Sequence, residues 1–464
     1  MNSKKDTIAN SLFLMISFLG IIVLQLVVRV NGISDDYLLY TFIFIILSIF
    51  MLFALQAYTV TKGKRKKLSF CIPFFVIWIL MCLCMLYSDI IVPKRYPYLS
   101  LVLLCIFTGV YILFLFITRE NRNRVLNVLI TSIIVAFVIA SVVCFLFRPF
   151  KVGIRYLGLS TNPNVYGMFL ISVSACLFTK LDYMIQNQAK LIKCIIIYVC
   201  IGMAFFFLYM TGARTSFMAI FAVLLVWFFI RLVLSRKSKQ SFIKYFLFAV
   251  PVIVVSFFVS YGMLATIPNL INKPIVFERD RDFLLNDDLT KICYASETTP
   301  DTTIEEIKND VEYAIENADK EPSLFKRISM IFSEGASLDT ILNGRISIYK
   351  DFSSKIDMLG HYKYGKKVNG TFVVNAHNNT IQMGYSYGIP AMIFYILLCV
   401  FALVYSIRYY ILYHKKYSCA VFPMLIVGAF LMTSLTECIM LPWQSLLAFA
   451  FYFCLGEIMN TQKE

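Results

Sequence analysis

The apolar sequence FIKYFLFAVPVIVVSFFVSYGMLA (residues 242–265) ends just before Thr266, and the next long apolar run, IPAMIFYILLCVFALVYSIRYYIL, begins only at residue 389. A helix of about 20 residues crosses a hydrocarbon core of ~30 Å, so both runs predict membrane spans. Residues 266–388 between them are polar and would lie on one face of the bilayer. A membrane protein needs no polar insert of this length in order to fold, so we expect the chemistry to be there.

Composition agrees with a membrane protein. Hydrophobic residues make up 59% of the chain, charged residues 15%, and the mean hydropathy is +0.76. Soluble domains have about 45–50% apolar and about a quarter charged residues. We predict an all-α polytopic membrane protein with nine spans in residues 1–265, one large external loop with amphipathic helices in 266–388, and three spans in 389–464. The twelve expected spans are residues 11–30, 38–58, 70–92, 98–117, 125–147, 165–181, 194–210, 216–234, 242–265, 389–412, 419–435 and 441–458.

Basic residues indicate the orientation in the membrane. The formal charge is +16, but most cations form five clusters between apolar runs, a pattern typical of topology signals and not of nucleic-acid binding. The clusters lie in residues 62–67, 119–124, 180–193, 236–239 and 408–416, each after an even-numbered span. The positive-inside rule therefore predicts that both termini are cytoplasmic and that the insert is external.

Cysteine spacing gives no sign of a metal site. Twelve of the thirteen cysteines lie in or beside apolar runs, and only Cys293 lies in the insert. No Cys-x-x-Cys motif and no Cys/His pair has a metal-binding spacing. Asp280-Arg281-Asp282 has the spelling of a nucleotide-sugar DxD motif, but it lies in the insert on the predicted outer face, where nucleotide sugars are absent. We interpret it as a chance match.

The third external loop contains Arg155 and the segment Asn162-Pro163-Asn164, which predicts an N-cap and a first-turn proline for the next span. Two readings stay open. The arginines simply face outward beside a well-capped helix, or they and the free N–H groups of the helix form an anion site.

Arg214 stands at the start of the eighth span. An arginine costs ~2.5–3.5 kcal/mol at the bilayer centre, so this one has to reach outward, pair with an acid or bind an anion. Glu437, in the last external turn, is a candidate partner for one of these arginines.

The insert has two apolar periodicities that predict amphipathic helices, over residues 304–318 and 341–356, with Arg345 near the start of the second. His377 lies just before the tenth span. Histidine ordinarily titrates near pH 6.5, so a neutral imidazole there can accept a proton. His361 and His414 lack such a setting.

These segments together resemble the bacterial O-antigen ligase and O-antigen polymerase superfamily. The matching pieces are residues 155–167, Ala213-Arg214-Thr215, Asn343-Gly344-Arg345 with Tyr349 in place of a frequent tryptophan, and Ala376-His377-Asn378 followed by Gly388. The resemblance covers residues 148–395 and the twelve-span plan, and it implies a GT-C-like architecture.

The resemblance implies an inverting, metal-independent glycosyltransferase without a cofactor, acting at the outer face of a bacterial cytoplasmic membrane. Its donor would be a polyprenyl-diphosphate-linked oligosaccharide, and a flippase and a chain-length regulator would be candidate partners. His377 would be the general base, and Arg155, Arg214 and Arg345 would bind the diphosphate. Asn378, Asn162, Asn164 and Glu437 would orient substrate.

Three functions stay open at this point. A polymerase would join repeat units into a capsule or exopolysaccharide, whereas a ligase would transfer finished O-antigen to lipid A core. A polysaccharide flippase or solute transporter also has twelve spans, but it predicts ionisable residues inside the spans and a repeat between the two halves.

Overall fold

The computed structural model describes residues 2–27, 43–55, 71–93, 98–148, 155–160, 162–234, 239–271, 273, 275, 345–362, 366–368, 371–373 and 375–460. These residues form helices almost throughout. The helices are α1 (Asn2–Val27), an unlabelled helix Ile43–Leu55, α3 (Ile72–Ile91), α4 (Tyr98–Val102), the π-helix η2 (Leu103–Phe107), α5 (Thr108–Phe116), α6 (Arg119–Phe147), α7 (Pro163–Gln186), α8 (Leu191–Met210), α9 (Arg214–Leu234), α10 (Lys239–Ile271), α16 (Arg345–Ser353), α17 (Asn379–Tyr413), α18 (Phe422–Ser434) and α19 (Leu446–Ile458).

Among the described residues, nine helical segments are long and apolar enough to cross a bilayer. Three shorter apolar helices, Ile43–Leu55, α18 and α19, lie where the second, eleventh and twelfth spans were expected. Large apolar side chains are exposed on the outside of the helices, for example Phe258, Ile196 and Leu270. Such a surface is suited to contact with lipid. The chain is thus an all-α, multi-pass membrane protein, and the number twelve stays a prediction.

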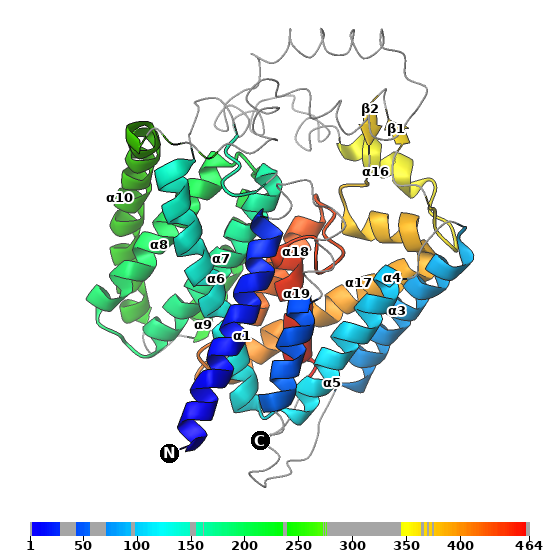
Figure 1. The fold of residues 1–464 in the computed structure, drawn as a ribbon, viewed down its shortest axis with the longest axis horizontal. Coiled ribbons are helices and arrows are strands. Elements are labelled where there is room, and N and C mark those ends of the chain that lie inside the picture. The colour runs from blue at the N-terminus through cyan, green and yellow to red at the C-terminus, as the bar shows by residue number, and fades with distance from the viewer. Residues whose placement is uncertain are drawn as a thin grey trace.

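Figure 1 shows α8 and α10 on one side of the molecule, α3 and α4 on the other, and α18 and α19 between them. Helix α7 is central. In an apolar stretch of 18 residues, 83% of α7 is buried inside the protein, whereas only 22% of the corresponding stretch of α10 is buried. The starts of α6, α7, α17 and α19 have polar N-caps, from Thr118, Asn162, Asn378 and Ser445. The sequence-based prediction of an N-cap and a first-turn proline at Asn162 and Pro163 is confirmed.

The tenth expected span begins earlier than the sequence suggests. Helix α17 starts at Asn379, ten residues before Ile389, and bends at Gly388, whose φ of 85° is left-handed. A Cβ at Gly388 would lie 2.3 Å from the carbonyl oxygen of Met358, so only glycine permits this close approach of two backbone segments. The amide of Ile389 donates to the carbonyl of Asp357 at 2.9 Å. The first segment of α17 is thus a separate short helix at the end of the molecule where α16 lies (Figure 1).

The structure describes part of the insert, around α16. The helix covers part of the second expected amphipathic run, and strands β1 (Lys366–Val368) and β2 (Thr371–Val373) form an antiparallel hairpin that the sequence reading did not predict. The helix expected over residues 304–318, the Asp280-Arg281-Asp282 segment and Cys293 lie outside the described residues.

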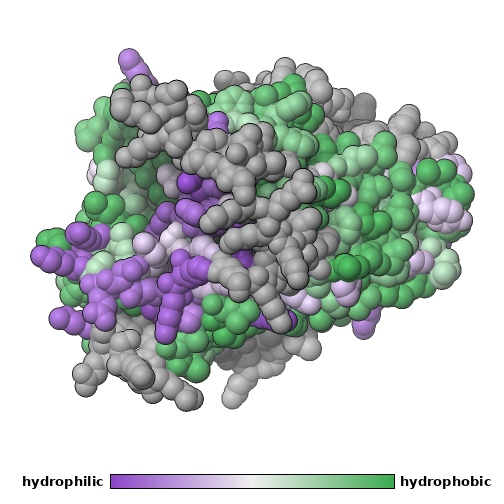
Figure 2. Space-filling model, turned by 90° about the horizontal axis from the view of Figure 1, so that it is seen from below, coloured by the Kyte–Doolittle hydropathy of each residue, from purple (hydrophilic) through white to green (hydrophobic). Residues whose placement is uncertain are grey.

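Three of the five basic clusters meet on the face opposite α16. Arg119 lies 4.1 Å above the ring of Tyr413, and Asn127 contacts both Lys180 (3.2 Å) and Ser418 (2.7 Å). Figure 2 shows hydrophilic side chains gathered on part of this face, bordered by hydrophobic surface. The start of α1 lies at the same end of the molecule (Figure 1). This separation agrees with the predicted loop sidedness, while the cytoplasmic assignment itself stays a prediction.

Arg122 does not behave as a surface topology signal. It is fully buried, pairs with Glu457 at 2.6 Å, and also donates to the carbonyls of Phe114 and Ile117 at the end of α5. A second buried pair joins Arg231 to Asp182 at 3.5 Å. Both acids accept a hydrogen bond from α17, Glu457 from Tyr409 and Asp182 from Tyr410. The two pairs therefore tie α17 to α19 and α7.

Candidate functional site

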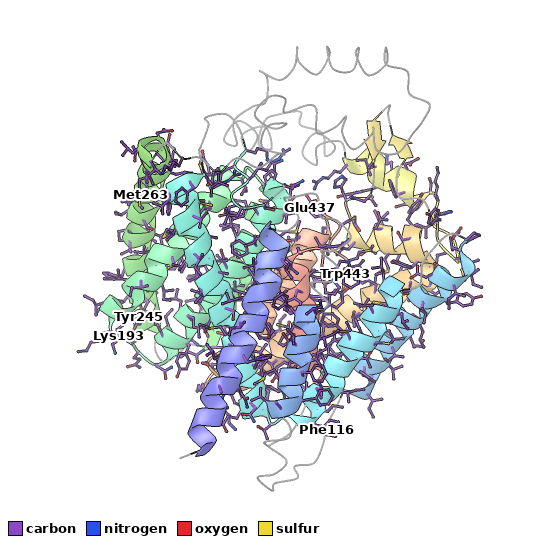
Figure 3. The ribbon with its side chains drawn as sticks, viewed as in Figure 1. Phe116, Lys193, Tyr245, Met263, Glu437 and Trp443 are labelled. Atoms are coloured by element: carbon purple, nitrogen blue, oxygen red, sulfur yellow. The ribbon has the colours of Figure 1, made fainter. Side chains whose placement is uncertain are left out.

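Glu437 lies at the centre of the candidate site, in the turn between α18 and α19 at the end of the molecule nearest α16. Figure 3 shows it there, with Lys193 and Phe116 at the opposite end. Its carboxylate is 11% exposed. One oxygen, Oε1, accepts from Arg345 Nη2 at 2.9 Å and from Asn164 Nδ2 at 3.2 Å. The other oxygen, Oε2, lies 3.8 Å from His377 Nδ1.

Arg155 reaches this cluster through Asn164. Its Nη2 donates to Asn164 Oδ1 at 2.7 Å, and its Nε donates to the carbonyl of Thr211 at 2.9 Å. The side chain lies over Gly212, where a Cβ would be 3.4 Å from it and where φ is +59°. The loop before α7 and the turn between α8 and α9 are thus held together by one guanidinium.

Arg345 is the first residue of α16. Besides Glu437 it contacts Thr215 Oγ1, at 3.5 Å from Nη1. Tyr349 is four residues further along and so on the same face of the helix. Its hydroxyl donates to the carbonyls of Leu435 (2.9 Å) and His377 (3.3 Å).

Arg214 is the first residue of α9 and has no hydrogen bond or ion pair with a described residue. Its side chain is partly exposed, and the positive charge of Arg345 repels its guanidinium. The start of α9 can approach α7 closely because residue 167 is glycine: a Cβ there would lie 2.5 Å from Ser216 Oγ. Arg214 is therefore a cation held beside another cation, an arrangement that an anion would stabilise.

His377 has an unusual backbone. Its φ of 48° is left-handed, which is rare for a residue with a side chain, and its amide donates to Asn375 Oδ1 at 3.0 Å. The side chain is 34% exposed, and Nδ1 has no hydrogen bond to a described residue although it faces Glu437. Strained backbone of this kind persists only where the surrounding structure maintains it, and it clusters at functional sites.

Glu437 is ionised although it is buried. Burial alone would raise its pKa, but His377 and the guanidinium of Arg345 bring the pKa below the ordinary value of 4.5. Burial also raises the pKa of the neighbouring Cys438 thiol to about 12, so that thiol stays protonated at neutral pH. A carboxylate, not a thiolate, is the anionic group at the centre of the site.

The N-terminal ends of four helices, α7, α9, α16 and α17, meet around Glu437. Asn164, Arg214, Arg345 and Asn378 mark these four ends. Each N-terminus carries a partial positive charge, and Arg155 adds to the charges of Arg214 and Arg345. Three guanidinium groups and four helix ends outweigh one carboxylate, so the site is suited to an anionic ligand.

The structure brings together most of the residues predicted from the sequence, and two of the asparagines among them cap helices. Asn162 and Asn378 serve as N-caps: Asn162 Oδ1 accepts from the Asn164 amide at 2.7 Å, and Asn378 Oδ1 accepts from Ile381 at 3.1 Å. In the sequence Tyr349 is only a motif position, and its four-residue spacing from Arg345 is the signal that could have placed it in the site. The described residues contain no group of three or more His, Cys, Asp or Glu side chains placed to hold a metal ion.

No protein-family model and no curated protein matches the chain. The fold defines a helical, multi-pass membrane protein. The site has one partly exposed imidazole, one buried carboxylate and three guanidinium groups at one end of the helices.

Proposed function

We propose that this protein is an inverting, metal-independent glycosyltransferase that polymerises polyprenyl-diphosphate-linked oligosaccharide units at the outer face of a bacterial cytoplasmic membrane. The observation that carries the proposal is a linked set of five residues, in which contacts of 2.7–3.8 Å connect cations to a base candidate through one carboxylate. The set is Arg155, Asn164, Glu437, Arg345 and His377. No binding of nucleic acid is part of this function.

The arginines would stabilise the leaving group. When the C–O bond between the anomeric carbon and the diphosphate breaks, the electron pair stays on the diphosphate oxygen, whose charge rises. Fixed guanidinium groups stabilise that charge with forked hydrogen bonds. Arg214 is the leading candidate for direct contact, because Arg345 already binds Glu437 and Arg155 already binds Asn164.

His377 would remove the proton from the attacking sugar hydroxyl. Glu437 faces Nδ1, so a tautomer with the proton on Nδ1 leaves the lone pair of Nε2 for that proton. The hydroxyl oxygen then forms a bond to the anomeric carbon on the face opposite the diphosphate, and the configuration inverts. The imidazolium that results is stabilised by the carboxylate of Glu437.

Two alternatives remain. An O-antigen ligase would use the same donor and the same groups but would transfer the glycan to lipid A core. A polysaccharide flippase or solute transporter is favoured by the buried pairs Arg122–Glu457 and Asp182–Arg231, because ionisable residues inside spans often mark a transport path. Each of these residues has a partner of opposite charge, which also fits a structural role.

Reconstitution tests the proposal. Purified full-length protein in proteoliposomes should extend a lipid-linked oligosaccharide into polymer without added nucleotide or metal. Flipping of the lipid-linked substrate without polymer would support the transporter. In cells, a deletion strain with one repeat unit per acceptor indicates a lost polymerase, and free long chains indicate a lost ligase.

A further inference from the structure

A long apolar groove lies between α9 and α10, with α7 and α8 as its floor. Its volume is about 690 Å³. Phe217, Leu224 and Phe228 of α9 form one wall, and Ile253 and Phe257 of α10 form part of the other. The side of the molecule that contains α10 is visible at the left of Figure 1.

The groove is open to the lipid, and its lining is almost entirely apolar. Phe221 and Phe258 on its rims are 61% and 67% exposed. The polar atoms of three lining residues are engaged elsewhere: Tyr198 donates to the carbonyl of Tyr245, Tyr245 to that of Ala189, and Trp227 to Asp182. A ligand in this groove therefore has to be an apolar chain.

The outer end of the groove lies directly below the cations. Phe217 is three residues after Arg214, less than one helical turn or about 5 Å along the axis. Tyr209, which also lines the groove, is two residues before Thr211, the acceptor for Arg155. From Phe217 to Phe229 the lined part of α9 extends about 18 Å toward the opposite face, more than half of the hydrocarbon core.

We propose that this groove binds the isoprenoid chain of a lipid diphosphate whose head group lies at Arg214 and Arg155. This inference rests on the proposed function and specifies where the lipid part of the donor binds. The cations at its outer end select a lipid with a highly charged head group. More than half of the lining side chains are aromatic, and their broad faces suit a branched, unsaturated chain better than a narrow saturated one.

Photolabelling tests the groove. Full-length protein in phosphatidylglycerol nanodiscs is labelled with undecaprenyl diphosphate that carries a diazirine on its chain, and labelled peptides are identified by mass spectrometry. We expect labelling at residues 217–229 and 246–258, removed by excess unlabelled undecaprenyl diphosphate but not by added phosphatidylglycerol. Leu224→Trp and Ile253→Trp, which fill the groove from its two walls, should each lower this labelling about tenfold. Val226→Trp, on α9 but outside the groove and 47% exposed, is the matched control.

Labelling spread evenly over all lipid-facing helices, or equal competition by phosphatidylglycerol, would overturn the inference, since ordinary membrane lipid would then fill the groove. The outcomes separate it from the proposed function. Specific labelling without polymer formation supports the chain site and refutes the glycosyltransferase. Polymer formation that is normal in both tryptophan variants, with labelling elsewhere, refutes the groove alone.

Discussion

His377 Nδ1 lies 3.8 Å from Glu437 Oε2, and the other oxygen of the same carboxylate accepts a hydrogen bond from Arg345. The base candidate and one of the candidate diphosphate-binding groups therefore share one acid. Residues 345, 377 and 437 come from three separate segments. Since Arg345 and His377 both face the carboxylate of Glu437, a change in any of the three residues should affect the other two.

The first prediction concerns the base. His377→Ala should lower the rate of chain extension by about 10²–10⁴-fold, because proton transfer by a positioned side chain typically contributes that much. Polymer length and yield in proteoliposomes measure the effect. His414→Ala, on the opposite face, is the control and should keep full activity. Normal polymer from His377→Ala would refute the assignment.

The second prediction separates Arg214 from Arg345. Arg214→Lys should abolish most chain extension, since an ammonium lacks the planar pair of donors, yet leave the unfolding temperature unchanged because the guanidinium has no described partner. Arg345→Lys should lower both activity and unfolding temperature, because it disturbs the contact with Glu437. Thermal unfolding in detergent and polymer yield are the two measurements. Equal stability losses in both variants would contradict the arrangement.

The third prediction is a pH dependence. The pKa of Glu437 is lower in the folded protein than its ordinary 4.5, so its stabilising contribution is complete above about pH 4.5 and is lost as the pH falls through the folded pKa. Glu437→Gln should reduce stability at neutral pH by roughly 1–3 kcal/mol and flatten the acid side of the profile. Unfolding temperature measured from pH 3 to 7 tests this, with Glu120→Gln as an exposed control.

The fourth prediction concerns the buried pair. Glu457→Met or Arg122→Met alone should cost about 3–5 kcal/mol, because each leaves an uncompensated buried charge, whereas the double variant with both changes should recover part of that loss. A double-mutant cycle on the free energy of unfolding in detergent gives the coupling. Additive losses would show that the two side chains do not depend on each other.

The fifth prediction concerns the bend in α17. Gly388→Ala places a Cβ 2.3 Å from the Met358 carbonyl at a left-handed φ, so it should destabilise the protein by more than about 1 kcal/mol and lower activity through displacement of the first segment of α17. Gly262→Ala is the matched control, because a Cβ there meets no atom within 4 Å. Similar unfolding temperatures for the two variants would argue against strain at Gly388.

Hydropathy was sufficient to predict an all-α, multi-pass membrane protein. A run such as residues 242–265 has to be a buried or lipid-facing helix whatever its neighbours are. Basic clusters predict sidedness without any tertiary contact, and the sidedness stays a prediction. Local rules also placed the N-cap at Asn162, since capping depends only on adjacent residues. The same rules put the start of the tenth span at Ile389, because the segment 379–387 is too polar to look like part of a span.

Tertiary structure decided the rest. That Glu437 joins Arg345, Asn164 and His377 depends on the packing of α7, α16, α17 and α18, which residue spacing cannot reveal over separations of 60 to 273 positions. Arg122 looked like a topology signal and is instead half of a buried pair, because its partner Glu457 lies 335 residues away. Helix formation and membrane insertion follow from local composition, whereas the meeting of charges at one site follows from long-range packing.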